Sequence, residues 1–220
     1  MTIKIGDKAP NLEISEWVQG LPSNIDKHIG KVILIEVFQV NCPGCFMYGI
    51  PDAINVYKKF SHDDVIVLGL ATAFEDYDKN TLDNLKLLLS SGEVIGETYK
   101  MLSQYGQLIN GNKLSYKIPF PVAMDRLKKI DPNVSKDKII DFITENVPNY
   151  ESYSESDKKV LYQRVYDYLR TKEYSASTFE EYSLQGTPSA IIVDRNGILR
   201  HKFFGVNGYI DNIIQDLVNE

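Results

Sequence analysis

The stretch VILIEVFQVNCPGC, residues 32–45, decides the fold. Its first seven residues are apolar and largely β-branched, with one acid among them, a pattern typical of a strand buried on both faces. Its last four residues are two cysteines, Cys42 and Cys45, that enclose Pro43 and Gly44. Proline suits the first turn of a helix, where no amide donor is needed. The stretch therefore predicts a buried strand, a CxxC pair and a helix in immediate succession.

The helix expected after the cysteines has apolar residues near helical spacing at Ile50, Ile54 and Tyr57. Pro51 is expected to kink it, because a proline inside a helix removes a hydrogen bond and crowds the preceding turn. Glu36 is the acid within the apolar strand. A carboxyl buried there should have a raised pKa. The plainer alternative is an acid whose side chain reaches solvent.

Strands and helices alternate along the rest of the chain. Apolar runs and helical spacing predict strands at 65–70, 118–124, 189–193 and 199–204, an Asn-Gly turn at 194–197, and helices at 81–91 and 210–218. The strand at 118–124 is expected at a sheet edge, because Pro119 and Pro121 have no amide to donate. Residues 7–19 are expected to form a hairpin or an extended arm. This order predicts an α/β fold.

Residues 131–174 differ in character and are rich in tyrosine and charge. One helical pattern begins at Ser135, and a second follows the capping-box spacing of Ser154 and Asp157. The apolar face of the second helix comprises Leu161, Val165 and Tyr168. We therefore predict that residues 1–220 form a single domain, interrupted by a helical insertion at about 131–174. Two roles for the insertion stay open: control of access to the cysteines, or added stability alone.

The composition is that of a soluble globular protein, with 220 residues, 43% of them hydrophobic and 25% charged. A net charge of −6 without a basic cluster argues against nucleic acid or an anionic membrane as partners. No segment reaches the roughly 18 apolar residues of a membrane span, and the N-terminus lacks the apolar core of a signal peptide. The expected location is cytoplasmic, or periplasmic or secreted if a presequence has been removed.

Cys42 and Cys45 are the only two cysteines of the chain. A bridge between them closes too short a loop to stabilise the fold much, so the pair serves reactivity or a metal, or arises by chance. Zinc needs two further ligands, and the three histidines, His28, His62 and His201, lack paired spacing. We therefore predict no metal and no cofactor other than a redox-active Cys42–Cys45 disulfide.

A thiol reacts as its thiolate. Cys42 stands where backbone amides and the positive end of a helix dipole point at its sulfur, so its pKa is expected below that of a free cysteine. Cys45 lies one turn inside the helix, less exposed but close enough to bridge. This division predicts Cys42 as the attacking thiol and Cys45 as the resolving thiol.

The order of strand, CxxC, kinked helix, distant Gly-Thr-Pro, strand and hairpin resembles the thioredoxin superfamily. More narrowly, it resembles the bacterial redoxins of the TlpA-like and peroxiredoxin-related group. The resembling residues are Gly6-Asp7-Lys8-Ala9-Pro10, residues 37–45, Gly186-Thr187-Pro188-Ser189 and residues 192–197. The resemblance covers about residues 5–125 and 175–220. It implies a thioredoxin-like fold with a central mixed β-sheet flanked by helices, and with the insertion before the cis-proline strand.

The resemblance also implies roles for single residues. Pro188 is expected in the cis form beside the cysteines, and the backbone of Thr187 is expected to pair with a bound substrate segment like an added strand. Pro43 and Gly44 complete the expected substrate-binding set. Glu36 occupies the place where thioredoxins have a buried acid that relays the proton of the resolving thiol, a role that a raised pKa suits.

Three departures from related patterns are visible. Asn41 stands where thioredoxin has tryptophan, and the lysine that partners the buried acid has no match. Peroxiredoxins have a threonine or serine three residues before their cysteine and a proline farther upstream, whereas this chain has Gln39 and Ile35. The last departure disfavours a peroxidase.

These features favour a thiol–disulfide oxidoreductase that acts on protein disulfides and uses a thiol reductant. The intervening Pro43 and Gly44 carry no charge to stabilise a thiolate strongly, which favours a reductant. Two alternatives stay open. The first is a thiol peroxidase with antioxidant activity, whose cysteine passes through sulfenic acid. The second is a thioredoxin-fold binding module that holds a partner through residues 131–174.

Overall fold

The protein is described from a computed structural model that covers residues 3–131 and 133–220. Met1 and Thr2, from the N-terminus that lacks a signal-peptide pattern, lie outside the described residues, as does Pro132 of the predicted insertion. The chain divides into two compact units. The larger unit comprises the residues up to Leu127 together with Ala176–Glu220, and the smaller unit is Lys128–Ser175.

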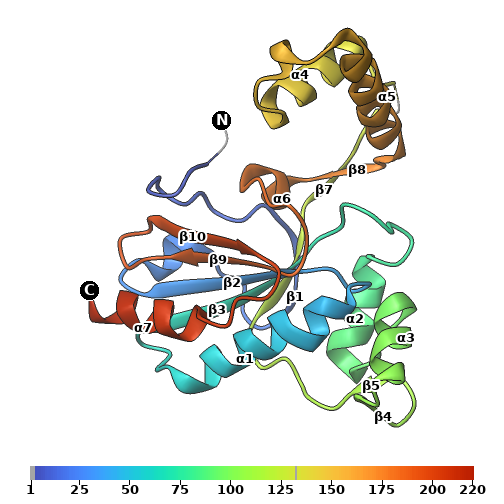
Figure 1. Cartoon of the computed structure of the whole chain (residues 1–220). Coiled ribbons are helices and arrows are strands. Elements are labelled where there is room, and N and C mark those ends of the chain that lie inside the picture. Colours follow the sequence, from blue (N-terminus) through green and yellow to red (C-terminus); the bar gives the residue numbers. More distant parts are fainter. Residues whose placement is uncertain (1–2, 132) are drawn as a thin grey trace. The chain divides into compact units, whose positions relative to one another are not determined.

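A six-stranded sheet forms the centre of the larger unit, in the order β1-β6-β3-β2-β9-β10 (Figure 1). Its strands are β1 (Ile14–Gln19), β2 (Val32–Phe38), β3 (Val65–Ala71), β6 (Val122–Asp125), β9 (Ser189–Val193) and β10 (Leu199–Phe204). β2 pairs in parallel with β3, and β3 in parallel with β6. β1, β9 and β10 join antiparallel to their neighbours. The predicted mixed α/β sheet is confirmed.

Helices and short elements of the larger unit complete the fold. They are η1 (Ile25–His28), the π-helical turn η2 (Cys45–Gly49), α1 (Ile50–Lys59), α2 (Leu82–Ser91), α3 (Gly96–Gln104), β4 (Leu108–Ile109), β5 (Lys113–Leu114), α6 (Ser177–Glu181) and α7 (Ile210–Asn219). Figure 1 shows α1 and α7 side by side along the sheet. An ion pair of 3.0 Å between Lys59 and Asp211 joins these two helices.

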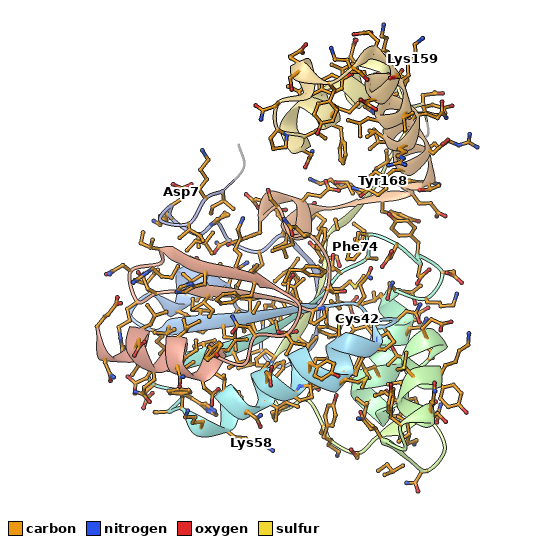
Figure 2. The ribbon with its side chains drawn as sticks, viewed as in Figure 1. Asp7, Cys42, Lys58, Phe74, Lys159 and Tyr168 are labelled. Atoms are coloured by element: carbon orange, nitrogen blue, oxygen red, sulfur yellow. A yellow bond between two sulfur atoms is a disulfide. The ribbon has the colours of Figure 1, made fainter. Side chains whose placement is uncertain are left out.

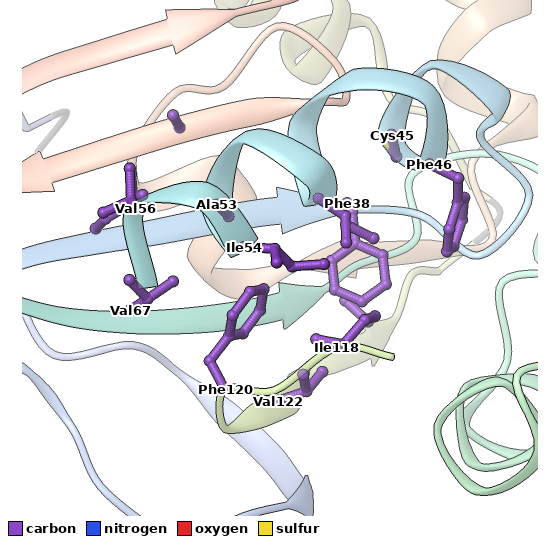
Figure 3. Packing of buried hydrophobic residues seen from close by; sticks show 14 of the residues in the cluster. Phe38, Cys45, Phe46, Ala53, Ile54, Val56, Val67, Ile118, Phe120 and Val122 are labelled. Carbon is purple, nitrogen blue, oxygen red and sulfur yellow. The ribbon is translucent and has the colours of Figure 1, made fainter. Parts of the chain in front are cut away.

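Every residue of β2 is buried, because successive side chains enter two different apolar cores. Val32, Leu34 and Phe38 face the core beneath α1, α2 and α7. The odd-numbered residues Ile33 and Ile35 face the second core, which the N-terminal arm and α6 cover. Figure 3 shows Ile54 of α1 pointing toward Phe38 of β2, with Phe120 nearby in the same core. Burial on both faces explains why β2 matches its predicted bounds.

A capping side chain starts α2 (Leu82–Ser91) close to where the sequence predicted this helix. The Thr81 hydroxyl accepts a hydrogen bond of 3.2 Å from the Asn84 amide at the start of α2. The strand predicted at 118–124 was wrong in its start, since β6 begins at Val122. Its predicted place at a sheet edge was also wrong, because β6 lies between β1 and β3. Pro121 is tolerated beside it because only its carbonyl is used, accepting from the Gly69 amide at 2.8 Å. α3 and the β4–β5 pair were not predicted.

The smaller unit contains two helices, α4 (Lys136–Asn146) and α5 (Glu155–Thr171), with the short turn η3 (Tyr150–Ser152) between them. Paired strands β7 (Leu127–Lys129) and β8 (Tyr174–Ala176) lie at its ends. The helix starts predicted at Ser135 and Ser154 are confirmed, since each side chain caps its helix. Its apolar core is built on Ile139, Ile143 and Val165.

Tyr168, predicted on the same face as Val165, is 45% exposed and contacts the ring of Phe142 at 5.6 Å between centroids. α5 has 17 residues and α4 only 11, so α4 is too short to cover the whole length of α5. Within residues 3–131 and 133–220, no helix has the length and apolar character needed to cross a bilayer.

Asp125 ties the end of β6 to α6, although the smaller unit separates them in sequence. Its fully buried carboxylate accepts hydrogen bonds from the Thr178 amide at 2.9 Å, the Phe179 amide at 3.2 Å and the Thr72 hydroxyl at 2.9 Å. Burial raises the pKa of Asp125, and these hydrogen bonds oppose that shift. The carboxylate therefore closes the larger unit on either side of the insertion.

Replacing Asp125 by alanine is expected to lower the free energy of unfolding by about 3 kcal/mol, because three buried donors lose their acceptor. Chemical denaturation followed by circular dichroism measures this difference. The control is Asp216→Ala on α7, an exposed site, where a change within about 0.5 kcal/mol is expected. A loss below about 1 kcal/mol for Asp125→Ala would show that the donors find other acceptors.

Candidate active site

The two cysteines lie where β2 gives way to the helical segment, and Figure 2 shows Cys42 at this junction. They form a disulfide with their Cα atoms 5.4 Å apart. Cys42 is 9% exposed and Cys45 is fully buried. Only the first cysteine therefore offers a sulfur near the surface, as an attacking thiol requires.

The backbone after Cys42 turns at once into a helix. Pro43 and Gly44 have helical conformation, and the π-helical turn η2 begins at Cys45. The Cys45 amide points back at Cys42, lying 3.2 Å from its Sγ and 3.1 Å from its carbonyl oxygen. An amide directed at sulfur stabilises negative charge there. The local fold thus supplies the electrostatic feature expected of a reactive thiol.

A second loop lies against Cys42, although it is distant in sequence. The peptide bond between Thr187 and Pro188 is cis, and the Thr187 carbonyl oxygen lies 3.5 Å from the Cys42 Sγ. The loop is held by the Ser189 hydroxyl, which donates to the Gly186 carbonyl at 2.7 Å. The tertiary structure therefore brings the Thr187 backbone directly beside the cysteine sulfur.

Pro43 and Gly44 are half-buried. A methyl group added to Gly44 would lie 3.6 Å from the Pro188 Cδ. Pro188 itself is buried. The four residues predicted to bind substrate, which include Thr187, thus adjoin one another around Cys42, and their role in binding stays a prediction.

Glu36 is 2% exposed and lies in the core beneath the active-site helix. Its Oε1 has no hydrogen-bond partner within the described residues. Desolvation raises the pKa of Glu36 well above its ordinary value, and the nearby charge of Asp52 raises the pKa further. A methyl group added to Gly49 would overlap this oxygen and would also crowd Pro188, so glycine is required there. Glu36 thus lies against the same turn that begins with Cys45.

No protein-family model matches the sequence, and no curated protein matches it either. A thioredoxin-like superfamily protein of known structure is 28% identical, with a TM-score of 0.59 over 97% of this chain and 97% of that one. A thiol–disulfide isomerase from Corynebacterium glutamicum is 26% identical, with a TM-score of 0.58 over 96% of this chain and 97% of that one.

The chain shares the thioredoxin-like fold of these two proteins. The thioredoxin domain of a thiol–disulfide oxidoreductase from Bacteroides vulgatus shares the fold at 14% identity, with a TM-score of 0.51 over 99% of this chain and 100% of that one. The predicted resemblance to the superfamily is therefore confirmed.

Asn41, which occupies the position of the thioredoxin tryptophan, has a structural role that the sequence did not reveal. It is 7% exposed, and its side chain donates to the Asp76 carboxylate at 2.7 Å and accepts from the Glu97 amide at 2.7 Å. Its own amide donates to the Asn80 side chain at 2.8 Å. Asn41 therefore fixes residues 76–80 and the start of α3 to the residue before Cys42.

Gln39 and Val40 extend this anchoring. The Gln39 side-chain oxygen accepts from the Phe74 amide at 3.0 Å, and the Thr98 hydroxyl donates to the Val40 carbonyl at 2.8 Å. Phe74 in turn stacks on the ring of Phe179 at 4.6 Å between centroids. The polar residues before the cysteines thus hold neighbouring loops in place. Their only sequence signal was their polarity directly after a buried strand.

Each of the three histidines contacts a side chain that is neither a cysteine nor another histidine. His28 is hydrogen-bonded to Ser23 at 2.6 Å, His62 lies against the Tyr57 ring, and His201 stacks on a phenylalanine of its own strand. Among the described residues, no three histidine, cysteine or acidic side chains form a group suited to a metal ion.

Replacing Glu36 by glutamine is expected to stabilise the disulfide form in a pH-dependent way. A raised folded-state pKa means that the stability contributed by protonated Glu36 is present near pH 4.5 and is lost as the pH rises towards the folded-state pKa. The advantage of the variant over the wild type should therefore grow with pH, by up to about 1.4 kcal/mol per pH unit. Denaturant titrations between pH 4 and pH 8 measure it.

The control is Glu75→Gln, at an exposed carboxyl, which should show a much smaller change in the free energy of unfolding over the same range. A stability difference for Glu36→Gln that stays constant across the same pH range would show that Glu36 is not held in a desolvated environment.

Proposed function

We propose that this thiol–disulfide oxidoreductase reduces or exchanges disulfides in protein substrates, with Cys42 attacking and Cys45 resolving. The observation that carries the proposal is the Cys42–Cys45 disulfide at the start of a helix, with the Cys45 amide 3.2 Å from the Cys42 sulfur. The Thr187 carbonyl, 3.5 Å from the same sulfur, supports a substrate backbone bound alongside. Similarity to a thiol–disulfide isomerase supports the same class of reaction.

The reaction proceeds in two exchanges. The Cys42 thiolate attacks one sulfur of the substrate disulfide, and the other sulfur leaves with the bonding electron pair and takes up a proton. The Cys45 thiol then loses its proton and attacks the Cys42 sulfur, which forms the intramolecular disulfide and releases the second substrate thiol. Two electrons and two protons pass from the dithiol to the substrate, and a thiol reductant returns them.

Glu36 is proposed to accept the proton of Cys45 during the second exchange. A carboxylate whose pKa is raised by burial is a stronger base once it is ionised. Its unpartnered oxygen lies against Gly49, the last residue of the turn that Cys45 begins. The Cys45 sulfur is fully buried, so a base inside the protein suits it better than bulk water.

Substrate binding is proposed to use the backbone of Thr187 and the surface of Pro43 and Gly44. An extended substrate segment would pair with Thr187 as an added strand, which places its disulfide beside Cys42. The Gly205 amide donates to the Pro188 carbonyl at 2.9 Å, so the far side of this loop is already occupied by the fold. Backbone pairing of this kind favours protein substrates over small disulfides.

The direction of exchange is proposed to be reduction, which suits the cytoplasm, where thiols are kept reduced. No charged group or histidine stands between the cysteines to stabilise a thiolate strongly. A reduction potential of the Cys42–Cys45 couple above about −150 mV would point to an oxidant instead. Control of substrate access by residues 131–174 stays a prediction.

Cys42 is expected to react as the nucleophile. In Cys45→Ser, the rate of alkylation by iodoacetamide should follow a pKa below that of a free cysteine, because the Cys45 backbone amide points at the Cys42 sulfur. Cys42→Ser is the matched variant. Its remaining thiol, Cys45, is buried and should therefore react on the order of tenfold more slowly at pH 7. Equal rates for the two variants would contradict the assignment.

Disulfide reduction is expected to exceed peroxide reduction. With dithiothreitol as reductant, the wild-type protein should speed the reduction of insulin, and Cys42→Ser and Cys45→Ser should abolish that effect. Peroxide consumption should stay near background, because Gln39 is engaged with the Phe74 amide and does not provide a peroxidase hydroxyl. Rapid peroxide turnover without insulin reduction would make the protein a thiol peroxidase.

A further inference from the structure

The turn that contains Cys45 leaves one carbonyl without a helical donor. In this π-helical turn the Ile50 amide donates to the Cys45 carbonyl, five residues back. The next donor in this register would be residue 51, which is a proline without an amide. The Phe46 carbonyl would therefore lack a partner, and Phe46 is only 1% exposed, so water does not readily replace it.

A tyrosine from another part of the chain supplies the missing donor. The Tyr116 hydroxyl donates to the Phe46 carbonyl at 2.7 Å, across 70 positions of sequence. Tyr116 lies in the segment after β5 and packs against the core beneath α1. Burial raises the pKa of Tyr116, so its hydroxyl keeps its proton and remains a donor at neutral pH.

This turn contains the resolving cysteine and lies against the acid proposed to take its proton. Cys45 is its first residue, and Gly49 is its last. Gly49 must lie close to the Glu36 carboxylate and to Pro188, since even a methyl group at this position would overlap them. A shift of the Phe46 peptide therefore moves Cys45 relative to Cys42 on one side and Gly49 relative to Glu36 on the other.

We propose that Tyr116 is a positioning residue for the resolving cysteine, whose hydroxyl replaces the helical donor that Pro51 removes and thereby fixes the turn Cys45–Gly49. The proposal rests on the proposed function, because it concerns the second exchange. In that step the Cys45 thiolate attacks the Cys42 sulfur of the mixed disulfide. The Cys42–Cys45 bond forms, and the outgoing thiolate leaves with the electron pair.

The experiment uses the reduced full-length protein and 5,5′-dithiobis(2-nitrobenzoate), which reports each exchange by release of one thionitrobenzoate. The first release follows attack by Cys42, and the second follows resolution by Cys45. Tyr116→Phe should leave the first rate within about twofold and slow the second by about tenfold, the effect of one lost buried hydrogen bond. The matched control is Tyr105→Phe, at a tyrosine that is 59% exposed, for which neither rate should change.

The decisive experiment repeats Tyr116→Phe in a protein that already carries Pro51→Ala. An alanine amide at position 51 can donate to Phe46 in the π register, and in an α register the Ile50 amide donates to it instead. Either arrangement makes the tyrosine hydroxyl redundant. In the Pro51→Ala background, Tyr116→Phe should therefore slow the second release by less than about twofold, where the same substitution alone costs about tenfold.

Three outcomes overturn the proposal: no slowing of the second release in Tyr116→Phe, equal slowing of both releases, or the same slowing in the Pro51→Ala background. If Tyr116→Phe alone does not fold, the Pro51→Ala background decides by the same criterion. Failure of the proposed function itself looks different, because the wild-type protein would then fail to speed insulin reduction while still releasing both thionitrobenzoates.

Discussion

The burial of β2 on both faces is the constraint on which the rest of the structure depends. All seven residues of the strand are buried, with β3 parallel on one side and β9 antiparallel on the other. Because β2 and β9 are antiparallel neighbours, the end of β2 lies beside the start of β9. The first strand leads into Cys42, and the second follows the Thr187–Pro188 bond. Their pairing therefore brings the cysteine and the proline loop together.

The buried polar groups of the larger unit differ in whether all of their polar atoms have hydrogen-bond partners. Asn41 and the Asp125 carboxylate each take part in three hydrogen bonds, and each ties together segments that are distant in sequence. Such groups offset the cost of burial with well-formed hydrogen bonds. Glu36 differs, because one of its oxygens has no partner in the described part of the chain. An unsatisfied buried carboxyl costs stability. Its position beside the cysteine turn is what the proposed proton transfer from Cys45 requires.

Local features of the chain were predictable wherever a single segment carries the physical cause. The bounds of β2, the Thr81 and Ser154 caps, and the β9–β10 hairpin follow from periodicity, capping and turn chemistry within a few residues. The strand at Val122 was misplaced, because its position in the sheet depends on which neighbours it meets. The acid in the β2 run was visible in sequence, but the groups that it faces were not.

The sequence by itself therefore determined the α/β fold, the strand–CxxC–helix succession and the cysteine pair, because each depends on residues that are close together along the chain. Only the tertiary structure decided that Asn41 donates a hydrogen bond to Asp76, that Thr187 lies against Cys42 and that the Tyr116 hydroxyl donates to the Phe46 carbonyl. These contacts join residues 35, 145 and 70 positions apart. No local pattern specifies such partners, because a hydrogen-bonding side chain fits many acceptors until the packed core places one of them within reach.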